Sequence, residues 1–189
     1  GYPEETNAPY GIAKKALLVH AQVNAAQYGQ KFAYLIPTNL FGPGDKFHPD
    51  VSHVIPALIK KCVEAKERGD SDIQVWGTGS ASREYLYVED AAAAIVRAAE
   101  VRDSVEPLNL GNNHEITIRE TVETIAEVVG FTGKLVWDPS KPDGQPRRRV
   151  DASEAERALQ WKAQVTFRAG LEKTVEWYLT HREEAERAT

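Results

Sequence analysis

The 189-residue sequence contains no methionine, and Cys62 is its single cysteine. One cysteine excludes an internal disulfide framework and favours a reducing compartment. No apolar run approaches the about 20 residues that span a bilayer, and residues 1–10 have neither the basic flank nor the apolar stretch of a secretory signal. We therefore expect a soluble, cytoplasmic protein without membrane contact. Because no methionine starts the chain, we also expect a fragment or a processed product.

An excess of basic charge is missing as well. The net charge of −5 argues against a nucleic-acid-binding protein, and no metal site is predicted. Hydrophobic residues at 42% and charged residues at 27% are typical of a globular protein. The chain is long enough for one domain with a substantial core.

The spacing of apolar residues predicts alternating helices and strands, and hence an α/β fold. Short apolar runs predict strands at 32–36, 73–77, 84–88, 108–111 and 134–138, with a turn-rich loop over 37–49. A first helix, capped by Thr6 or Asn7, is expected to bury Ile12, Ala16, Val19, Val23 and Ala26. A second, capped by Ser52, is expected to bury Ile55, Leu58, Ile59, Cys62 and Val63.

Three further helices are expected. An alanine-rich helix over 89–100 has side chains small enough for close packing. Capping-box spacing predicts helix starts at Thr117 with Glu120 and at Ser153 with Glu156. The last helix has an apolar face made of Phe167, Leu171, Thr174, Val175 and Tyr178.

Tyr10 and Lys14 lie four residues apart on the first predicted helix, so both side chains project from one face. A lysine ammonium near a phenol favours the phenolate, which can then exchange a proton with an alcohol or a carbonyl. Taken alone, the pair is more simply interpreted as part of a solvated helix face.

The surrounding motifs carry more information. APYGIAKK, followed by a long helix, a strand and PTNLFGPGD, resembles the extended short-chain dehydrogenase/reductase family. SHVIPALIKK (52–61), VWGTGSASREYLYVEDAA (75–92) and SKPDGQPRR (140–148) resemble GDP-L-fucose synthases in order and spacing. The resemblance covers nearly the whole chain.

The resemblance implies a role for each matching residue. Tyr10 is the expected general acid/base, and Lys14 is expected to assist it and to bind the nicotinamide ribose. The segment Pro37, Thr38, Asn39 and Leu40 is expected to line the nicotinamide, with a strand-ending turn as the alternative. His53 is expected to serve as the acid in epimerisation and to lie near the cofactor; the alternative is a histidine at a helix start without chemistry.

The nucleotide sugar is expected to bind to a second set of residues. Arg83 suits a diphosphate because its guanidinium can donate two parallel hydrogen bonds. Trp76 offers a flat apolar face, although core packing is an equal alternative for this residue. The remaining implied contacts are Lys61, Lys141 and Asp143. The run Arg147 to Arg149 fits a solvated charge cluster better than a phosphate site.

The resemblance also implies what is absent from this sequence. The family's glycine-rich βαβ half, which holds the dinucleotide pyrophosphate, has no counterpart here, and GTGSAS (77–82) is too poor in glycine. The partner serine and the reactive cysteine of the family would lie upstream, and Cys62 is not their equivalent. We expect residues of about 1–50 and 89–115 to be a remnant of the Rossmann domain. Residues of about 51–88 and 116–189 are expected to form the sugar-nucleotide-binding subdomain.

The implied parent is a GDP-4-keto-6-deoxy-mannose 3,5-epimerase-4-reductase that uses NADP(H), with NAD as the alternative cofactor. The fragment is expected to be inactive alone, to hold no tightly bound cofactor and to bind a GDP-sugar. It is also expected to self-associate, because strand edges and apolar faces at 32–36 and 108–111 would be left exposed. Two alternatives stay open: an NAD-dependent nucleotide-sugar 4-epimerase or 4,6-dehydratase, and a non-catalytic sugar-nucleotide-binding module.

Overall fold

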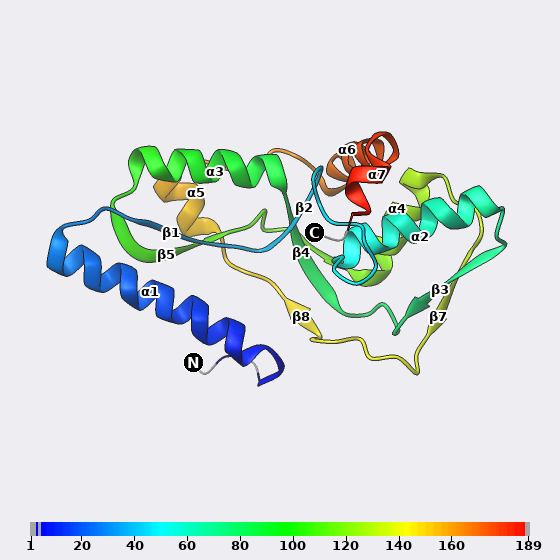
Figure 1. The fold of residues 1–189 in the computed structure, drawn as a ribbon, viewed down its shortest axis with the longest axis horizontal. Helices are drawn as coiled ribbons and strands as arrows, with labels where there is room; N and C mark the ends of the chain where they lie inside the picture. Colours follow the sequence, from blue (N-terminus) through cyan, green and yellow to red (C-terminus); the bar gives the residue numbers. More distant parts are fainter. Residues whose placement is uncertain (1–2, 4, 188–189) are drawn as a thin grey trace.

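The computed structural model describes residue 3 and residues 5–187 as strands flanked by helices, in the alternation that the sequence predicts (Figure 1). In chain order the elements are η1 (Glu5–Asn7), α1 (Ala8–Tyr28), β1 (Ala33–Pro37), β2 (Asn39–Phe41), α2 (Val54–Arg68), β3 (Asp72–Trp76), β4 (Ser82–Tyr87), α3 (Val88–Val101), β5 (Ser104–Leu110), β6 (Glu115–Thr117), α4 (Ile118–Val129), β7 (Lys134–Asp138), β8 (Arg147–Arg148), α5 (Ser153–Leu159), α6 (Phe167–Thr180) and α7 (Arg182–Ala185). Within these residues, no helix combines the length and the apolar character that crossing a membrane requires.

The central strands form one layer. Strand β1 pairs in parallel with β5, and β2 pairs in parallel with β4. Thr38, between β1 and β2, donates its N–H to the carbonyl of Leu110 at 2.8 Å, which joins the two pairs. Strand β6 is antiparallel to β4, β8 runs parallel to β4, and β3 and β7 form a separate parallel pair. The region expected to be only a loop therefore contributes strand β2.

Two hydrophobic clusters share strand β4. Leu86 belongs to a smaller cluster with the alanines of α3 and with Leu108 of β5. Tyr85 and Tyr87, which flank Leu86 and point to the opposite face, belong to a larger cluster built mainly from α2, α4 and α6. The predicted apolar face of the last helix is buried as expected.

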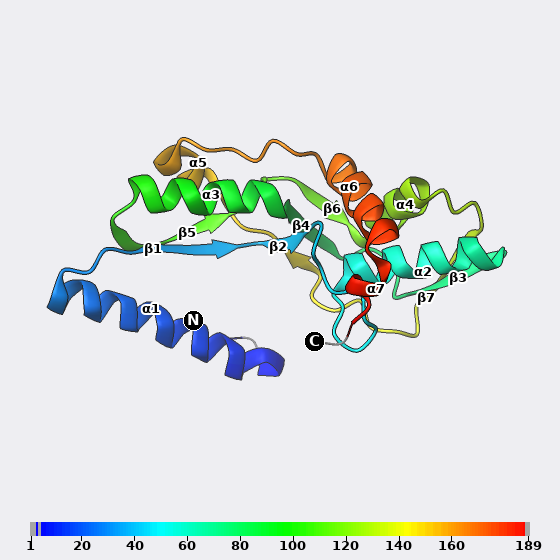
Figure 2. The same cartoon turned by 45° about the horizontal axis from the view of Figure 1, so that its top comes forward.

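Helices α1 and α3 lie on opposite sides of the β1–β5 strand layer (Figure 2). On α3, Ala91, Ala94 and Ala98 are buried against the strands. On α1, only Ala8 and Ala21 are buried. The two long helices beside the same strands are therefore packed to very different extents.

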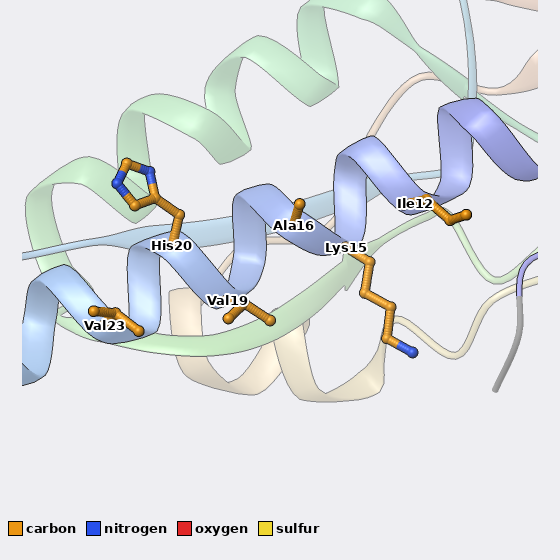
Figure 3. Close-up of a pocket in the computed structure, with 6 residues that line it drawn as sticks. All are labelled: Ile12, Lys15, Ala16, Val19, His20 and Val23. Atoms are coloured by element: carbon orange, nitrogen blue, oxygen red, sulfur yellow. The ribbon is translucent and has the colours of Figure 1, made fainter.

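The apolar face predicted to be buried on α1 is mostly exposed, which corrects the expectation from sequence. Val19 is 51% exposed and Val23 43% exposed. With Ile12 (48% exposed), Lys15, Ala16 and His20 they line a shallow apolar hollow on the helix surface (Figure 3). The physical reason is that no described element packs over this face. The apolar periodicity of a helix identifies the face that can be buried, but it does not show whether another element packs against that face.

Helix ends follow the capping predictions in part. Thr117 and Glu120 form the predicted capping box at the start of α4. The predicted cap at Ser52 is wrong, because His53 is the N-cap of α2. The predicted box at Ser153 is also wrong: Ala152 is the N-cap, and Glu156 instead accepts a hydrogen bond from the Asn113 amide at 2.9 Å.

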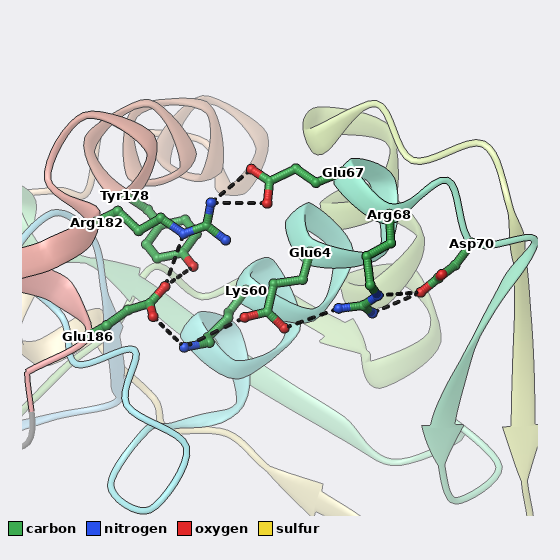
Figure 4. Close-up of polar contacts among 8 residues, drawn as sticks. All are labelled: Lys60, Glu64, Glu67, Arg68, Asp70, Tyr178, Arg182 and Glu186. Atoms are coloured by element: carbon green, nitrogen blue, oxygen red, sulfur yellow. Dashed lines mark hydrogen bonds and ion pairs between the residues drawn. The ribbon is translucent and has the colours of Figure 1, made fainter.

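A polar network fastens the carboxyl-terminal helices to α2 (Figure 4). The Glu186 carboxylate accepts hydrogen bonds from the Tyr178 hydroxyl at 2.6 Å and from Arg182 Nε at 3.1 Å, and pairs with Lys60 Nζ at 2.8 Å. Arg182 also pairs with Glu67 at 2.8 Å. Burial raises the pKa of Glu186, but these three partners outweigh it and hold that pKa at about 2.

Candidate functional site

Tyr10 and Lys14 lie together on the surface of α1. The Lys14 ammonium is 5.4 Å from the centre of the Tyr10 ring, and Tyr10 is 60% exposed. Their helix is tied to β1 by the Tyr34 hydroxyl, which donates to the Lys14 carbonyl at 2.8 Å. The predicted pair is thus adjacent and accessible.

The segment 37–40 combines two exposed apolar side chains with two fixed polar ones. Pro37 and Leu40 are exposed. The Thr38 hydroxyl and the Asn39 amide both donate to the carbonyl of Glu84, at 3.0 and 3.1 Å. The polar side chains therefore anchor the segment to β4, while the apolar ones remain available to a flat ring.

Trp76 is a surface residue and does not pack in the core. It ends β3, where Ile73 and Val75 alternate inward and are buried, so that Trp76 is 67% exposed. The Lys141 ammonium lies 5.6 Å from the centre of the indole. An exposed indole beside a cation offers a stacking surface for an aromatic base.

Asp143 is held by the loop between β3 and β4. Its carboxylate accepts from the Thr78 N–H at 2.7 Å and the Thr78 hydroxyl at 2.8 Å, and these bonds, led by the one from the hydroxyl, lower the pKa of Asp143. Gly77 adopts a left-handed φ of 82°, and a Cβ there would lie 2.3 Å from the carboxylate. Asp143 thus fixes the 141–146 loop beside Trp76.

Arg83 and the arginine run meet beside the same loop. Arg83 Nη1 donates to the carbonyl of Gln145 at 2.7 Å. Arg147 forms a two-point pair with Glu115, and this contact, together with a hydrogen bond from the Ser82 hydroxyl, lowers the pKa of Glu115 to about 2. Arg148 and Arg149 are exposed. The 141–146 loop therefore has a cation beside the Trp76 indole at one end and the Arg83 guanidinium at the other, and guanidinium and ammonium groups suit phosphate oxygens.

His53 and Lys61 lie on α2. His53, the N-cap of that helix, is exposed. The Lys61 ammonium donates to the Gln74 carbonyl of β3 and so is already engaged by protein. Burial raises the pKa of the Cys62 thiol to about 11, which agrees with the expectation that this cysteine is not the reactive one.

Six of the predicted residues form two groups. Trp76, Arg83, Lys141 and Asp143 come together around the 141–146 loop. Tyr10 and Lys14 form the other group, and among the described residues no hydrogen bond, ion pair or ring contact between side chains joins them to the first. In the same part of the chain, no group of three or more His, Cys, Asp or Glu residues is arranged to hold a metal ion.

Sequence reasoning missed two residues that organise these groups. Thr78 binds Asp143, and Glu84 joins segment 37–40 to the strand that bears Arg83. The signal for Thr78 was present in GTG (77–79), where both glycines have a left-handed φ. Glu84 gave no signal, because a buried glutamate cannot be distinguished from a surface one in a strand pattern.

The strand layer and its flanking helices define an α/β protein, and the comparisons identify its family. Residues 1–111 match the NAD dependent epimerase/dehydratase family, and the chain belongs to this family. Among curated proteins it is similar to GDP-L-fucose synthase 1 of Arabidopsis thaliana, with 47% identity over 93% of this chain and 54% of the relative. It is also similar to GDP-L-fucose synthase of Escherichia coli, with 41% identity over 97% and 60%.

Solved structures agree. A GDP-L-fucose synthetase from Naegleria fowleri superimposes with a TM-score of 0.91 at 33% identity, covering 99% of this chain and 59% of the other, and has also been solved bound to NADP. A UDP-glucose 4-epimerase from Thermotoga maritima gives a TM-score of 0.81 at 27% identity, covering 93% and 54%. The chain spans little more than half the length of these relatives.

Proposed function

We propose that this chain is the carboxyl-terminal, substrate-binding portion of a GDP-4-keto-6-deoxy-mannose 3,5-epimerase-4-reductase, the type of enzyme that makes GDP-L-fucose. The observation that carries the proposal is 41–47% identity with GDP-L-fucose synthases over more than nine-tenths of the chain. Fold likeness alone would not support a reaction, because related folds host several chemistries.

The proposed nucleotide-sugar site is the group around the 141–146 loop. Trp76 stacks on the base, while Arg83 and Lys141 contact the diphosphate, with Lys61 nearby on α2. Asp143 supports the site by holding the loop in place through Thr78. Because Arg83 is part-buried and anchored to Gln145, its guanidinium is oriented before the ligand arrives.

The proposed proton chemistry belongs to Tyr10, Lys14 and His53. Tyr10 protonates the oxygen that develops at C4 of the sugar, and Lys14 stabilises the phenolate that remains. The adjacency of the phenol and the ammonium supports these roles. His53 supplies a proton during epimerisation, a role that its exposed position at the start of α2 supports.

NADP(H) is the proposed cofactor of the parent enzyme, and when bound it supplies the hydride that reduces C4. The residues present fit one end of it: Pro37 and Leu40 are exposed apolar surfaces beside the anchored Thr38 and Asn39, and Lys14 is accessible. The NADP-bound relative supports this choice. We propose that 1–50 and 89–115 belong to the dinucleotide-binding domain, and 51–88 and 116–189 to the substrate subdomain.

Binding measurements on the 189-residue chain test the substrate assignment. Calorimetric titration with GDP-mannose, a stable GDP-sugar, should show binding, with UDP-glucose weaker and NADPH very weak because only one end of its site is present. Equal affinity for GDP-mannose and UDP-glucose would contradict the GDP-sugar assignment.

Activity measurements test the incompleteness of the chain. Alone, it should oxidise NADPH with the keto-sugar nucleotide at a small fraction of the rate of a full-length relative. A chimaera that places the amino-terminal part of the E. coli relative before this chain should gain activity. In that chimaera Tyr10→Phe should lower kcat by about 10²–10⁴-fold, while Tyr28→Phe, at the far end of α1, serves as the control.

A second candidate is a nucleotide-sugar 4-epimerase or 4,6-dehydratase that uses NAD. The likeness to a UDP-glucose 4-epimerase favours it, but at 27% identity against 41–47%. A third is a sugar-nucleotide-binding module without catalysis. Binding of GDP-mannose together with an inactive chimaera would favour the module.

A further inference from the structure

Glu84 is a buried carboxylate at the centre of β4. Its side chain is 0% exposed, although charged residues are rarely buried completely unless their charge is compensated. One neighbour in sequence is Arg83 of the proposed substrate site, and the other, Tyr85, belongs to the larger core cluster. The burial of this carboxylate therefore requires contacts that compensate its charge.

The Glu84 carboxylate binds backbone N–H groups of two other segments. Oε1 accepts from Asn112 at 2.8 Å and Asn113 at 2.9 Å, and Oε2 accepts from Val150 at 3.1 Å. Gly111 makes the approach possible, because a Cβ there would lie 2.2 Å from Oε1. Hydrogen bonds to an ionised acceptor are stronger than neutral ones, so the carboxylate fixes β4 to both segments.

The main chain of Glu84 binds a third segment. Its carbonyl accepts from the Thr38 hydroxyl at 3.0 Å and the Asn39 amide at 3.1 Å. The peptide of Glu84 therefore lies between the proposed nicotinamide segment and Arg83. Any displacement of this peptide moves the two ligand-binding segments relative to each other.

We infer that Glu84 is a positioning residue, which sets the place of Thr38 and Asn39 relative to Arg83 by holding β4 against residues 111–113 and 150. The inference rests on the proposed function for the ligands of those segments. Glutamine at this position has nearly the same shape but only one oxygen. Its NH₂ group would face a backbone N–H donor, and the strand would have to shift.

Asp90 provides a matched control. It is also a buried carboxylate, 8% exposed, and its Oδ2 accepts from the N–H groups of Gln164 at 3.1 Å and Val165 at 2.9 Å. It lies on α3 and contacts none of the proposed ligand-binding residues. Asp90→Asn thus removes a buried carboxylate bound by backbone donors and leaves intact the hydrogen bonds that join Glu84 to the neighbouring segments.

The test compares the wild-type chain with Glu84→Gln and Asp90→Asn, each at a temperature where it is folded. Titration with GDP-mannose should show an affinity about tenfold lower for Glu84→Gln and little changed for Asp90→Asn. In ¹H–¹⁵N NMR spectra, the Asn39 side-chain amide should shift in Glu84→Gln and not in Asp90→Asn.

Other outcomes overturn the inference. Equal losses of affinity in both variants would mean a structural role only, as would an unchanged affinity in Glu84→Gln. If the wild-type chain does not bind GDP-mannose, the proposed function fails, and the NMR signal of the Asn39 amide then tests the positioning role alone. An Asn39 signal that does not shift in Glu84→Gln would overturn that role. Should Glu84→Gln not fold, two other variants disturb the same hydrogen bonds of the Glu84 carboxylate: Glu84→Asp, shorter by one methylene, and Gly111→Ala. Both are judged by the same criteria.

Discussion

The two ends of the molecule differ in how far they bury their own apolar surface. Around α2, α4 and α6, the helices bury a large cluster and are fastened by the network of Lys60, Arg182 and Glu186. Around α1, the apolar residues Val19 and Val23 lie open. The region around α2, α4 and α6 buries its apolar surface within itself, whereas the apolar face of α1 is not covered by any described residues.

This difference shows that the two proposed sites have different structural requirements. The group around Trp76 and Asp143 is fixed by contacts between its own loops, from Thr78 to Asp143 and from Lys141 to Trp76. The Tyr10–Lys14 pair stands on a helix held mainly along one side. The following predictions probe that contrast.

The largest effect is expected in the closed region. Leu171 is 0% exposed on α6, and Leu17 is 53% exposed on α1. Leu171→Ala should lower the free energy of unfolding by about 2–5 kcal/mol, since it leaves a cavity, whereas Leu17→Ala should change it by about 0.5 kcal/mol or less. Urea denaturation measures both, and equal losses would contradict the contrast.

The next effect concerns the exposed indole. Trp76→Ala should weaken GDP-mannose binding by about 1–3 kcal/mol, the range for stacking of a base on an aromatic side chain. Tyr28→Ala removes an equally exposed aromatic, 70% against 67%, from the far end of α1 and should leave the affinity unchanged. Calorimetry with both variants separates a stacking contact from a general surface effect.

A smaller effect follows from the network at Glu186. Its folded pKa, about 2, lies below the usual value for a glutamate, so its contribution to stability is present above that usual value and is lost as the pH falls towards 2. Glu186→Gln should cost about 1–2 kcal/mol at pH 7, after allowance for partial exposure. The gap from wild type should shrink by pH 3 in urea titrations. Glu183→Gln, exposed on α7, is the control.

The smallest effect concerns self-association. We expect copies of the chain to associate through uncovered surfaces such as α1 and the edge of β1. Val19→Lys should weaken that association by about 1 kcal/mol, because the half-exposed valine loses the apolar surface that it would bury between copies. Leu179→Lys, at a 53% exposed position on α6, should not. Light scattering that gives a monomer for the wild-type chain at high concentration would contradict the expectation.

Local patterns predicted the elements well and their surroundings less well. Strand β7 has the predicted bounds 134–138, and the capping box at Thr117 is present, because both depend on adjacent residues. The burial of Val19 was predicted wrongly, because burial depends on a partner that periodicity cannot supply. The exposed apolar surface expected at 108–111 was wrong too: Leu108 and Leu110 are buried under α3 and α5.

The predictions for the site divide in the same way, between contacts of nearby residues and contacts of distant ones. The adjacency of Tyr10 and Lys14 was predictable from their helical spacing. The bond between Thr78 and Asp143 spans 65 residues; GTG (77–79) marks the turn at Thr78, but no sequence pattern indicates Asp143 as its partner. The roles given to the individual site residues stay predictions until the binding measurements are made.

Strand β4 places Leu86 in one hydrophobic cluster and Tyr85 and Tyr87 in the other. Unfolding of either cluster therefore exposes one face of β4, and the other cluster depends on the same strand. Heat should accordingly disrupt both together, as a single cooperative transition in scanning calorimetry, despite the unequal packing of the two ends.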